Sequence, residues 1–263
     1  MTRGDAFLKL ARADEHLDTL YAEIEAWSAS HPYRIIRESK PDSDLLVVYA
    51  EPLSQPPLKL SLILGDVLQN LRACLDYIAL DLNERGLGAP LAEGAEHASH
   101  FPICRSEKLF AEACRSIIPH VAPGPRTVIK RVQPYHRGED WTSDYLAIVQ
   151  RLSDFDKHRR LPLVAQHAHL SPTDGMSPAR WQATEFEVTF PRVFEAKTEL
   201  FRAHGLTDVT GSEVDVDFRL TVDVAFADGA PAPVANAKLT AVMETLWQHI
   251  GREIVLPLKP YLQ

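Results

Sequence analysis

Two segments of the chain combine charged, amide and histidine side chains at spacings that could do chemistry. In the first, Asp66, Asn70 and Tyr77 lie at i, i+4 and i+11, within about 40° of one another on a helix. Arg72 and Asp76 form an i, i+4 pair on an adjoining strip. We expect these five side chains to bind a ligand if a second helix covers them and makes a buried polar network. The alternative is a solvated helix face with one surface ion pair, which contributes roughly 0–1 kcal/mol.

The second segment is the end of a later predicted helix, from Arg151 to Arg160. Arg151 and His158 are seven residues apart, so they share a helix face. They are the candidate catalytic residues, because an anion-handling site needs a cation to hold phosphate and a histidine to move a proton. Asp154 lies four residues before His158, where its carboxylate could orient the imidazole. The alternative is a charged helix end whose basic residues complement the C-terminal dipole.

Asp156 and Arg159 in the same segment are expected to contribute to ligand binding. A metal site made from Asp154, Asp156 and His158 is disfavoured, because i, i+2 and i+4 spacing on a helix directs the first two ligands apart. Closely spaced histidines elsewhere lack the additional ligands that a zinc site needs. The sequence therefore predicts no metal and no cofactor.

Familiar catalytic signatures are missing from the sequence. It contains no GxGxxG dinucleotide loop, no GxxxxGK[ST] phosphate loop and no HExxH zinc helix. It also contains no GxSxG nucleophile elbow. Several large enzyme classes are therefore excluded.

Long amphipathic helices must position the two polar segments. Apolar residues at spacings of three, four and seven predict a helix over residues 4–28. Leucines and isoleucines at spacings of three and four predict a second helix from residue 58. We expect this second helix to be the most buried in the protein and to end over residues 83–88, which contain two glycines.

The region between the two polar segments is expected to hold shorter elements. A helix is predicted over residues 109–118, with Ser106 as its N-cap, and another over residues 126–132. Residues 133–142 are expected to form a loop. Ser143 is expected to cap the helix that carries the second polar segment.

Strand signals flank the helices. Two β-rich runs, residues 33–39 and 45–50, are separated by turn-forming residues and predict a hairpin. Runs over residues 163–169, 184–190 and 214–227 alternate between apolar and polar side chains, as expected for antiparallel strands with one wet face. An amphipathic helix over residues 234–255 closes the chain.

These elements predict an α+β fold in which long amphipathic helices pack on a mostly antiparallel sheet. Strands occur both before and after the helices, so we expect one domain over residues 1–263. A weak boundary near residues 170–180 is the alternative, because serine, proline and glycine cluster there.

The amino-acid composition limits the partners and the cellular compartment that we expect for the protein. The 263 residues carry 28 basic and 36 acidic side chains, a net charge of −8, which disfavours broad nucleic-acid binding. Cys74, Cys104 and Cys114 are an odd number without CxxC spacing, so we expect buried thiols rather than disulfides. No signal-peptide core or membrane-spanning run is apparent. The sequence therefore predicts a soluble cytoplasmic protein with no membrane association.

Residues 65–77 resemble the pattern GD-x-x-x-NLR-x-x-LD-x-x-A of a group of bacterial proteins, many from actinobacteria. Relatives often have His at the positions of Gln69 and Tyr77. The FPI and DKHR runs at residues 101–103 and 156–159 resemble two later blocks of that group. The resemblance covers most of the chain, from the first helix to about residue 255. No activity is established for the group, so the resemblance implies a bacterial family and no function.

A second resemblance is to HEPN-type ribonucleases, which are helical and use an Arg followed four to six residues later by a His. Arg151 and His158 have six intervening residues and fit that pattern. Arg72 and Tyr77 have four, but the His is missing. The acidic net charge and the predicted sheet also depart from that family.

Three hypotheses follow. The leading one is a bacterial cytoplasmic protein that binds a small polar or anionic ligand where the helices over residues 58–83 and 143–160 meet. The second is a metal-independent ribonuclease in which Arg151 holds phosphate and His158 is the general acid or base. The third is a structural or interaction protein with no site. The sequence leaves open the ligand, whether the protein is an enzyme, and whether it forms a homo-oligomer.

Overall fold

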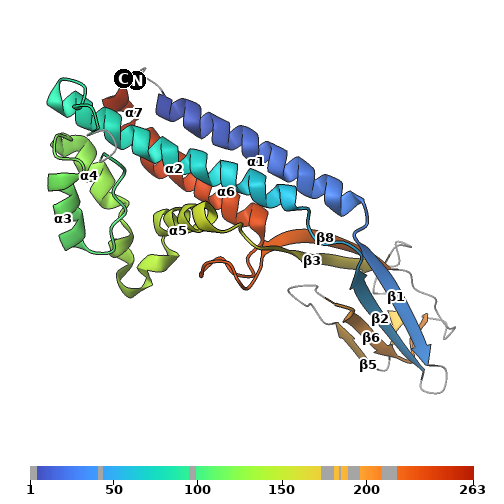
Figure 1. Ribbon diagram of the computed structural model, residues 1–263. Coiled ribbons are helices and arrows are strands. Elements are labelled where there is room, and N and C mark those ends of the chain that lie inside the picture. The colour runs from blue at the N-terminus through green and yellow to red at the C-terminus, as the bar shows by residue number, and fades with distance from the viewer. Residues whose placement is uncertain are drawn as a thin grey trace.

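The computed structural model describes residues 5–40, 44–94, 99–172, 181–183, 185–188, 196–208 and 218–263. Figure 1 shows an elongated helical body with the strands gathered toward one end. In the body, α1 (Asp5–Ala29) packs along α2 (Leu58–Leu87) and also contacts α6 (Leu239–His249). Helices and antiparallel strands together confirm the predicted α+β fold class.

The central helix is α2, which buries more side chains than any other described helix. Its predicted apolar stripe is fully covered, with no exposed surface at Leu60, Leu64, Leu68, Leu71 or Leu75. The i, i+4 and i, i+3 spacing places these leucines on one face, against α1 and the later helices. The prediction that this helix would be the most buried is confirmed.

The end of α2 lies within the predicted range of residues 83–88. The helix continues through residues 83–87 and ends at Leu87, where Gly88 adopts a left-handed conformation with φ of 76°. Gly86 lies inside the helix, and a Cβ atom there would stand 1.6 Å from the His120 carbonyl oxygen. Only Gly88 therefore ends the helix, whereas Gly86 permits a close approach of another segment.

The next two helices follow the sequence closely. α3 (Glu107–Ser116) begins with the predicted cap, because Ser106 Oγ accepts a hydrogen bond from Leu109 N–H at 3.2 Å. α4 (Pro123–Arg131) begins three residues earlier than predicted. Pro123 fits the first helical turn, because an N–H group at that position would have no acceptor within the helix.

The predicted loop over residues 133–142 is wrong. Residues Pro134–Ser143 form the 3₁₀ segment η3, which is interrupted at Gly138, where φ is 60°. Short 3₁₀ turns lack an apolar period, so the sequence pattern did not reveal them.

The predicted cap of α5 (Tyr145–His158) is also wrong by one residue. Asp144 is the N-cap, since its carboxylate accepts a hydrogen bond from Leu146 N–H at 2.9 Å. Ser143 Oγ instead donates to the Asp140 carbonyl oxygen at 2.7 Å.

The described strands form three separate antiparallel sheets. The predicted hairpin is confirmed as β1 (Tyr33–Lys40) and β2 (Leu45–Pro52). These strands belong to a four-stranded sheet of order β1-β2-β6-β5, completed by β6 (Thr198–His204) and β5 (Glu185–Val188). The other two sheets have two described strands each. One pairs β3 (Leu163–Pro172) with β8 (Phe218–Phe226), and the other pairs β4 (Trp181–Gln182) with β7 (Thr207–Asp208).

The alternating pattern predicted for residues 214–227 is confirmed where the structure describes it. In β8, Leu220, Val222, Val224 and Phe226 are buried, whereas Thr221 is exposed. The β3–β8 pair contributes to the same core as the helices, and β8 contacts both α1 and α6. Residues 214–217, and residues 184, 189 and 190 of the other predicted strand, lie outside the described ranges.

The closing helix differs from the predicted range at both ends. α6 begins at Leu239, because residues 234–237 turn back to pair with Phe226. It continues as the π-helical segment η5 (Ile250–Val255) and then as α7 (Leu256–Leu262). The wider π turn was not predictable from an apolar period of 3.6 residues.

Most elements share one hydrophobic core, and a small second cluster of Val48, Phe201, Ala203 and Leu206 lies in the four-stranded sheet. Ile35 packs against both clusters. The single domain stays a prediction, and residues 173–180 of the alternative boundary lie outside the described part of the chain. Among the described helices, none has a stretch that is long and apolar enough to cross a bilayer.

Candidate functional site

The two polar segments meet where α5 packs against α2. Gln69 Nε2 donates to the Ser153 carbonyl oxygen at 3.4 Å, and Ser153 Oγ donates to Gln69 Oε1 at 3.4 Å. One turn along each helix, the Asp156 carboxylate lies against Gly65, where an added Cβ atom would stand 2.6 Å from Asp156 Oδ2. The α2–α5 joint is therefore made by Gly65 and Gln69 on one helix and by Ser153 and Asp156 on the other.

The Asp156 carboxylate occupies an unfavourable position for a negative charge. Partial burial raises its pKa above the ordinary value. A hydrogen bond with the Gln69 side chain opposes this change, and the nearby Asp66 carboxylate adds to it. Among the described residues, no cation counteracts this rise in pKa, so the carboxylates of Asp66 and Asp156 share a half-covered corner without an opposite charge.

Asp66 lies near this corner, and Asn70 follows it one turn along α2, whereas Tyr77 lies elsewhere. Asp66 is exposed, and Asn70 Nδ2 donates to the Asp66 carbonyl oxygen at 2.8 Å. Tyr77 is eleven residues from Asp66, or roughly 16 Å along the helix axis. Its ring lies 5.9 Å from the Lys9 ammonium on α1. The predicted set is therefore divided along α2.

Arg72 and Asp76 form the predicted pair, and the pair binds the backbone of Phe101. Arg72 Nη2 lies 2.7 Å from Asp76 Oδ1 and donates to the Phe101 carbonyl oxygen at 3.1 Å. Asp76 Oδ1 in turn accepts a hydrogen bond from Phe101 N–H at 2.9 Å. The Arg72 side chain is only 10% exposed, so this is not a solvated surface pair. We call these three residues the Phe101 clamp.

Gln133 is a second polar residue that holds the same segment, and the sequence did not point to it. It is 1% exposed. Its Oε1 accepts a hydrogen bond from Cys104 N–H at 2.9 Å, and its Nε2 donates to the Pro102 carbonyl oxygen at 2.9 Å. Side chains thus bind the N–H and C=O groups of Phe101, the C=O group of Pro102 and the N–H group of Cys104, where a neighbouring strand would do so in a sheet.

Asn83 has a similar role at the far end of α2. It is 2% exposed, and its Oδ1 accepts a hydrogen bond from His120 N–H at 2.8 Å. Its Nδ2 donates to Ser99 Oγ at 3.3 Å and to the Ile117 carbonyl oxygen at 3.3 Å. A single amide next to an apolar stripe was the only local signal, and its bonding partners are 16 to 37 residues away in sequence.

Arg151 and His158 share a helix face as predicted, but that face is turned away from α2. At 100° per residue, both lie roughly 180° around α5 from the mean direction of Ser153 and Asp156, which contact α2. Arg151 is half-buried and His158 is exposed. Neither side chain makes a hydrogen bond or ion pair with another residue of the described ranges. The convergence of these residues with Asp66 and Asn70 does not occur.

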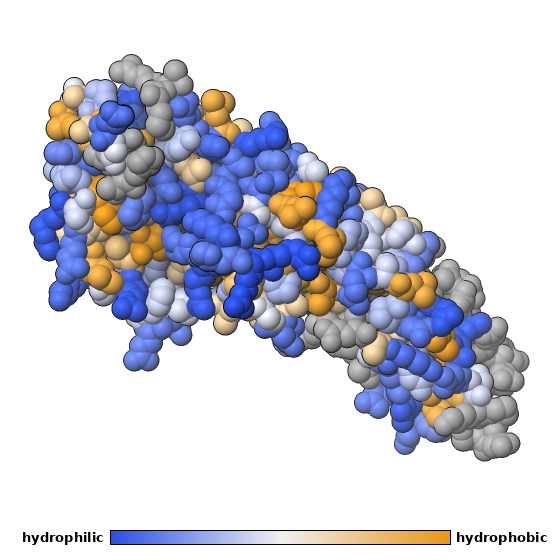
Figure 2. Space-filling model, viewed as in Figure 1, coloured by the Kyte–Doolittle hydropathy of each residue, from blue (hydrophilic) through white to orange (hydrophobic). Residues whose placement is uncertain are grey.

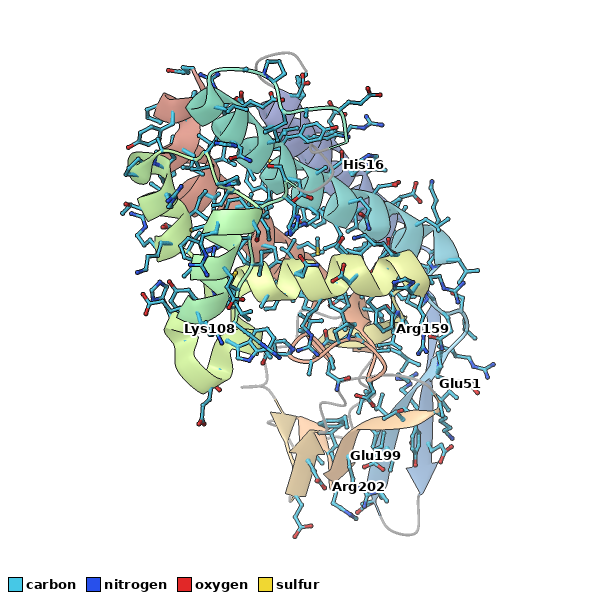
Figure 3. All side chains as sticks on the ribbon, turned by 60° about the vertical axis from the view of Figure 1, so that its left-hand side comes forward. His16, Glu51, Lys108, Arg159, Glu199 and Arg202 are labelled. Carbon is cyan, nitrogen blue, oxygen red and sulfur yellow. The ribbon has the colours of Figure 1, made fainter. Side chains whose placement is uncertain are left out.

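The remaining predictions for the end of α5 also need correction. Asp154 does not orient the His158 imidazole, because its carboxylate accepts hydrogen bonds from Gln150 Nε2 at 2.6 Å and from Lys157 Nζ at 3.3 Å. Figure 3 places Arg159 at the end of α5, close to the beginning of α2. Its side chain is exposed, so it lies at the margin of the joint rather than within it.

The chemistry that the corner could support is therefore limited to its carboxylates and amides. Figure 2 shows mostly hydrophilic residues over the middle of the face on which α5 lies. Within the described ranges, no group of three or more His, Cys, Asp and Glu side chains could hold a metal ion.

The cysteines are consistent with the predicted packing role. Cys74 and Cys104 are buried, and burial raises their pKa values to about 12 and about 11, so the nucleophilic thiolate is disfavoured. Cys114 is partly buried, and burial raises its pKa as well.

Comparison of the chain with protein-family models, with curated proteins and with solved structures finds no match. The resemblances to the actinobacterial group and to HEPN-type ribonucleases stay predictions.

Proposed function

We propose that the protein is a non-catalytic binding protein that holds a small polar ligand at the corner made by Asp66, Asn70 and Asp156. The observation that carries the proposal is the position of Asp156 against Gly65, with a second carboxylate nearby and no cation among the described residues that lowers the pKa of Asp156. The ionised form of such a half-buried carboxylate is stabilised by any group that donates hydrogen bonds or carries positive charge.

The charge at the corner limits the chemical class of ligand that could bind there. An anion would meet two carboxylates, whereas Arg151, the cation expected to hold it, lies on the far face of α5. A ligand that carries an ammonium, guanidinium or amide group fits better. Asn70 supports this choice, because its Nδ2 is already bonded to its own helix and its carbonyl oxygen remains to accept a hydrogen bond.

The ribonuclease hypothesis has less support from the geometry. Arg151 and His158 lie about 10.5 Å apart along the axis of α5. No described residue forms a bond to either side chain that would orient the two toward one substrate. We retain the bacterial cytoplasm as the proposed location, since unpaired cysteines at three positions are typical of a reducing compartment.

The proposal can be tested with small probes of matched shape. Methylguanidinium, methylurea and acetate represent a cation, a neutral donor and an anion, and their binding can be followed by the chemical shifts of Asn70 and Gln69 side-chain amides. We expect methylguanidinium to bind best, methylurea more weakly and acetate not at all. Asp156→Asn should weaken methylguanidinium binding by about tenfold, in line with the loss of one charge-assisted hydrogen bond.

Asp154→Asn is the matched control. It removes the same charge from the same helix, but Asp154 is exposed and bonded to Gln150 and Lys157. Methylguanidinium binding should be unchanged in this variant. Equal binding of acetate and methylguanidinium, or equal effects of the two substitutions, would exclude the proposed site.

A further inference from the structure

A groove lined by other elements than the α2–α5 corner has no role in the proposed function. It opens between the last turns of α1, the start of β1, β8 and the residues that lead into α6, and its volume is about 620 Å³. This volume lies within the range of about 300–1,000 Å³ that is typical of small-molecule sites. Its lining includes Tyr21, Ile24, Tyr33 and Val222, so much of its wall is aromatic or aliphatic.

Hydrogen bonds between the elements hold the groove open in one shape. Ser28 Oγ on α1 donates to the Val222 carbonyl oxygen on β8 at 2.8 Å. The Tyr33 hydroxyl on β1 donates to the Leu220 carbonyl oxygen. Tyr21 Oη on α1 donates to the Thr240 carbonyl oxygen on α6 at 3.4 Å. Hydrogen bonds therefore connect α1, β1, β8 and α6 around the groove, and a ligand would bind to a preformed site.

The backbone at one end of the groove has a conformation that residues other than glycine seldom adopt. His31 has φ of 52°, in the left-handed region, where it ends α1 and its N–H donates to the Ser28 carbonyl oxygen at 3.2 Å. This turn places the imidazole edge-on to the Tyr33 ring, with ring centroids 6.3 Å apart. An exposed histidine and a half-buried tyrosine thus form an aromatic wall.

The charges around the groove are mainly negative. Glu25 and Asp223 belong to its lining, and Lys238, the lining cation, is paired with Asp223 at 2.5 Å. The surroundings of Tyr21 are also acidic, since after burial the largest causes that raise its pKa are the carboxylates of Glu244, Asp18 and Asp14. Once Lys238 and Asp223 neutralise each other, the remaining field favours a cation.

We propose that this groove binds an amphipathic organic cation, with an apolar body against Ile24 and Val222 and a quaternary or protonated amine facing Tyr21, Tyr33 and Glu25. Tyrosine rings attract such cations through their π faces, and the acidic rim adds a Coulombic contribution. The site is distinct from the α2–α5 corner, because none of Gly65, Gln69, Ser153 and Asp156 belongs to the groove lining.

Benzyltrimethylammonium is a suitable probe, with benzyl alcohol as its neutral and benzoate as its anionic counterpart. Binding can be measured by isothermal titration calorimetry and by the ring resonances of Tyr21 and Tyr33. We expect the cation to bind at least about threefold more tightly than benzyl alcohol, and benzoate to bind least. Glu25→Gln should reduce that preference, whereas Glu15→Gln, on the same helix but outside the groove lining, should leave it unchanged.

Blocking the groove gives the sharper test. Ala29 is exposed and belongs to the lining, so Ala29→Trp should fill the opening and abolish binding. Ala26→Trp adds the same ring to an exposed position of the same helix outside the lining and should bind as the unmodified protein does. Both variants should keep the methylguanidinium response of the Asp156 corner, which separates this inference from the proposed function.

Two results would overturn the inference. One is binding of benzyltrimethylammonium that persists in Ala29→Trp. The other is a failure of the probe to shift the Tyr21 and Tyr33 ring resonances of the unmodified protein, which decides the matter even if a variant does not fold.

Discussion

The Asp156 carboxylate lies where the side chain of residue 65 would be if that residue were not glycine. An added Cβ atom at Gly65 would stand 2.6 Å from Asp156 Oδ2 and 2.9 Å from Oδ1. The obstructing atoms are the far end of a side chain that can rotate toward solvent, and this fact decides what a substitution would do. A second glycine in the same helix, Gly86, faces a fixed backbone carbonyl instead.

Gly65→Ala should therefore leave stability unchanged or raise it. Alanine is favoured over glycine inside a helix by about 1 kcal/mol, and the Asp156 side chain can rotate away. The pKa of Asp156 should then fall toward its ordinary value, because its burial is relieved. Urea unfolding and a carbon-detected titration of the carboxyl group measure the two effects.

Gly86→Ala is the counterpart with the opposite expected sign. The same gain in helix propensity applies, but the Cβ atom would stand 1.6 Å from the His120 carbonyl oxygen. We expect a loss of about 1–3 kcal/mol in the free energy of unfolding, as for other overpacked sites. Equal stability of the two alanine variants would contradict this account of the contacts.

The raised pKa of Asp156 predicts a pH dependence of stability. Because the folded state favours the protonated carboxyl, ionisation of Asp156 lowers stability as pH rises through the folded-state pKa, which lies above the ordinary value of 3.8. Asp156→Asn should be more stable than the unmodified protein at pH 7, and the difference should close as the pH falls below 3.8. Asp154→Asn should show no such gain, since it loses a bond to Lys157.

The Phe101 clamp predicts that substitutions of Arg72 and Asp66 change the free energy of unfolding by very different amounts, although both residues lie in the same predicted polar segment. Arg72→Ala would leave Asp76 without its cation and the Phe101 carbonyl oxygen without its donor, at a cost of about 2–4 kcal/mol. Asp66→Ala removes an exposed side chain and should change stability by less than about 0.5 kcal/mol. Chemical denaturation at neutral pH without ligand measures both, and a small effect of Arg72→Ala would refute a structural role for the clamp.

His249 predicts a second pH dependence, with the opposite sign. Burial lowers its pKa, although Asp144 and Glu253 oppose the change. The folded state thus favours neutral His249, and its contribution to stability is complete above pH 6.5 and is lost as the pH falls toward the folded-state pKa. His249→Phe keeps a ring against Tyr145, whose centroid lies 4.7 Å away, and should flatten this dependence. A melting temperature that falls equally between pH 7 and 5 in both proteins would exclude His249 as the cause.

The candidate site shows where reading a sequence succeeds and where it stops. The i, i+4 pairing of Arg72 with Asp76 followed from helix geometry and is confirmed. That the pair binds Phe101, 25 to 29 residues away in sequence, did not follow from it. The shared face of Arg151 and His158 was also correct, but its direction relative to α2 was not determined by spacing.

The sequence by itself determined the elements whose hydrogen bonds and apolar contacts are local. The leucine stripe of α2, the Ser106 cap of α3, the β1–β2 hairpin and the alternation in β8 all follow from periods of 3.6 and two residues or from adjacent side chains. Only the tertiary structure decided which face of α5 meets α2, what Arg72, Asn83 and Gln133 bind, and that Tyr21 and Tyr33 share a groove. A helix period specifies that two side chains lie on one face, but the partner of that face depends on long-range packing, which leaves no periodic trace in the chain.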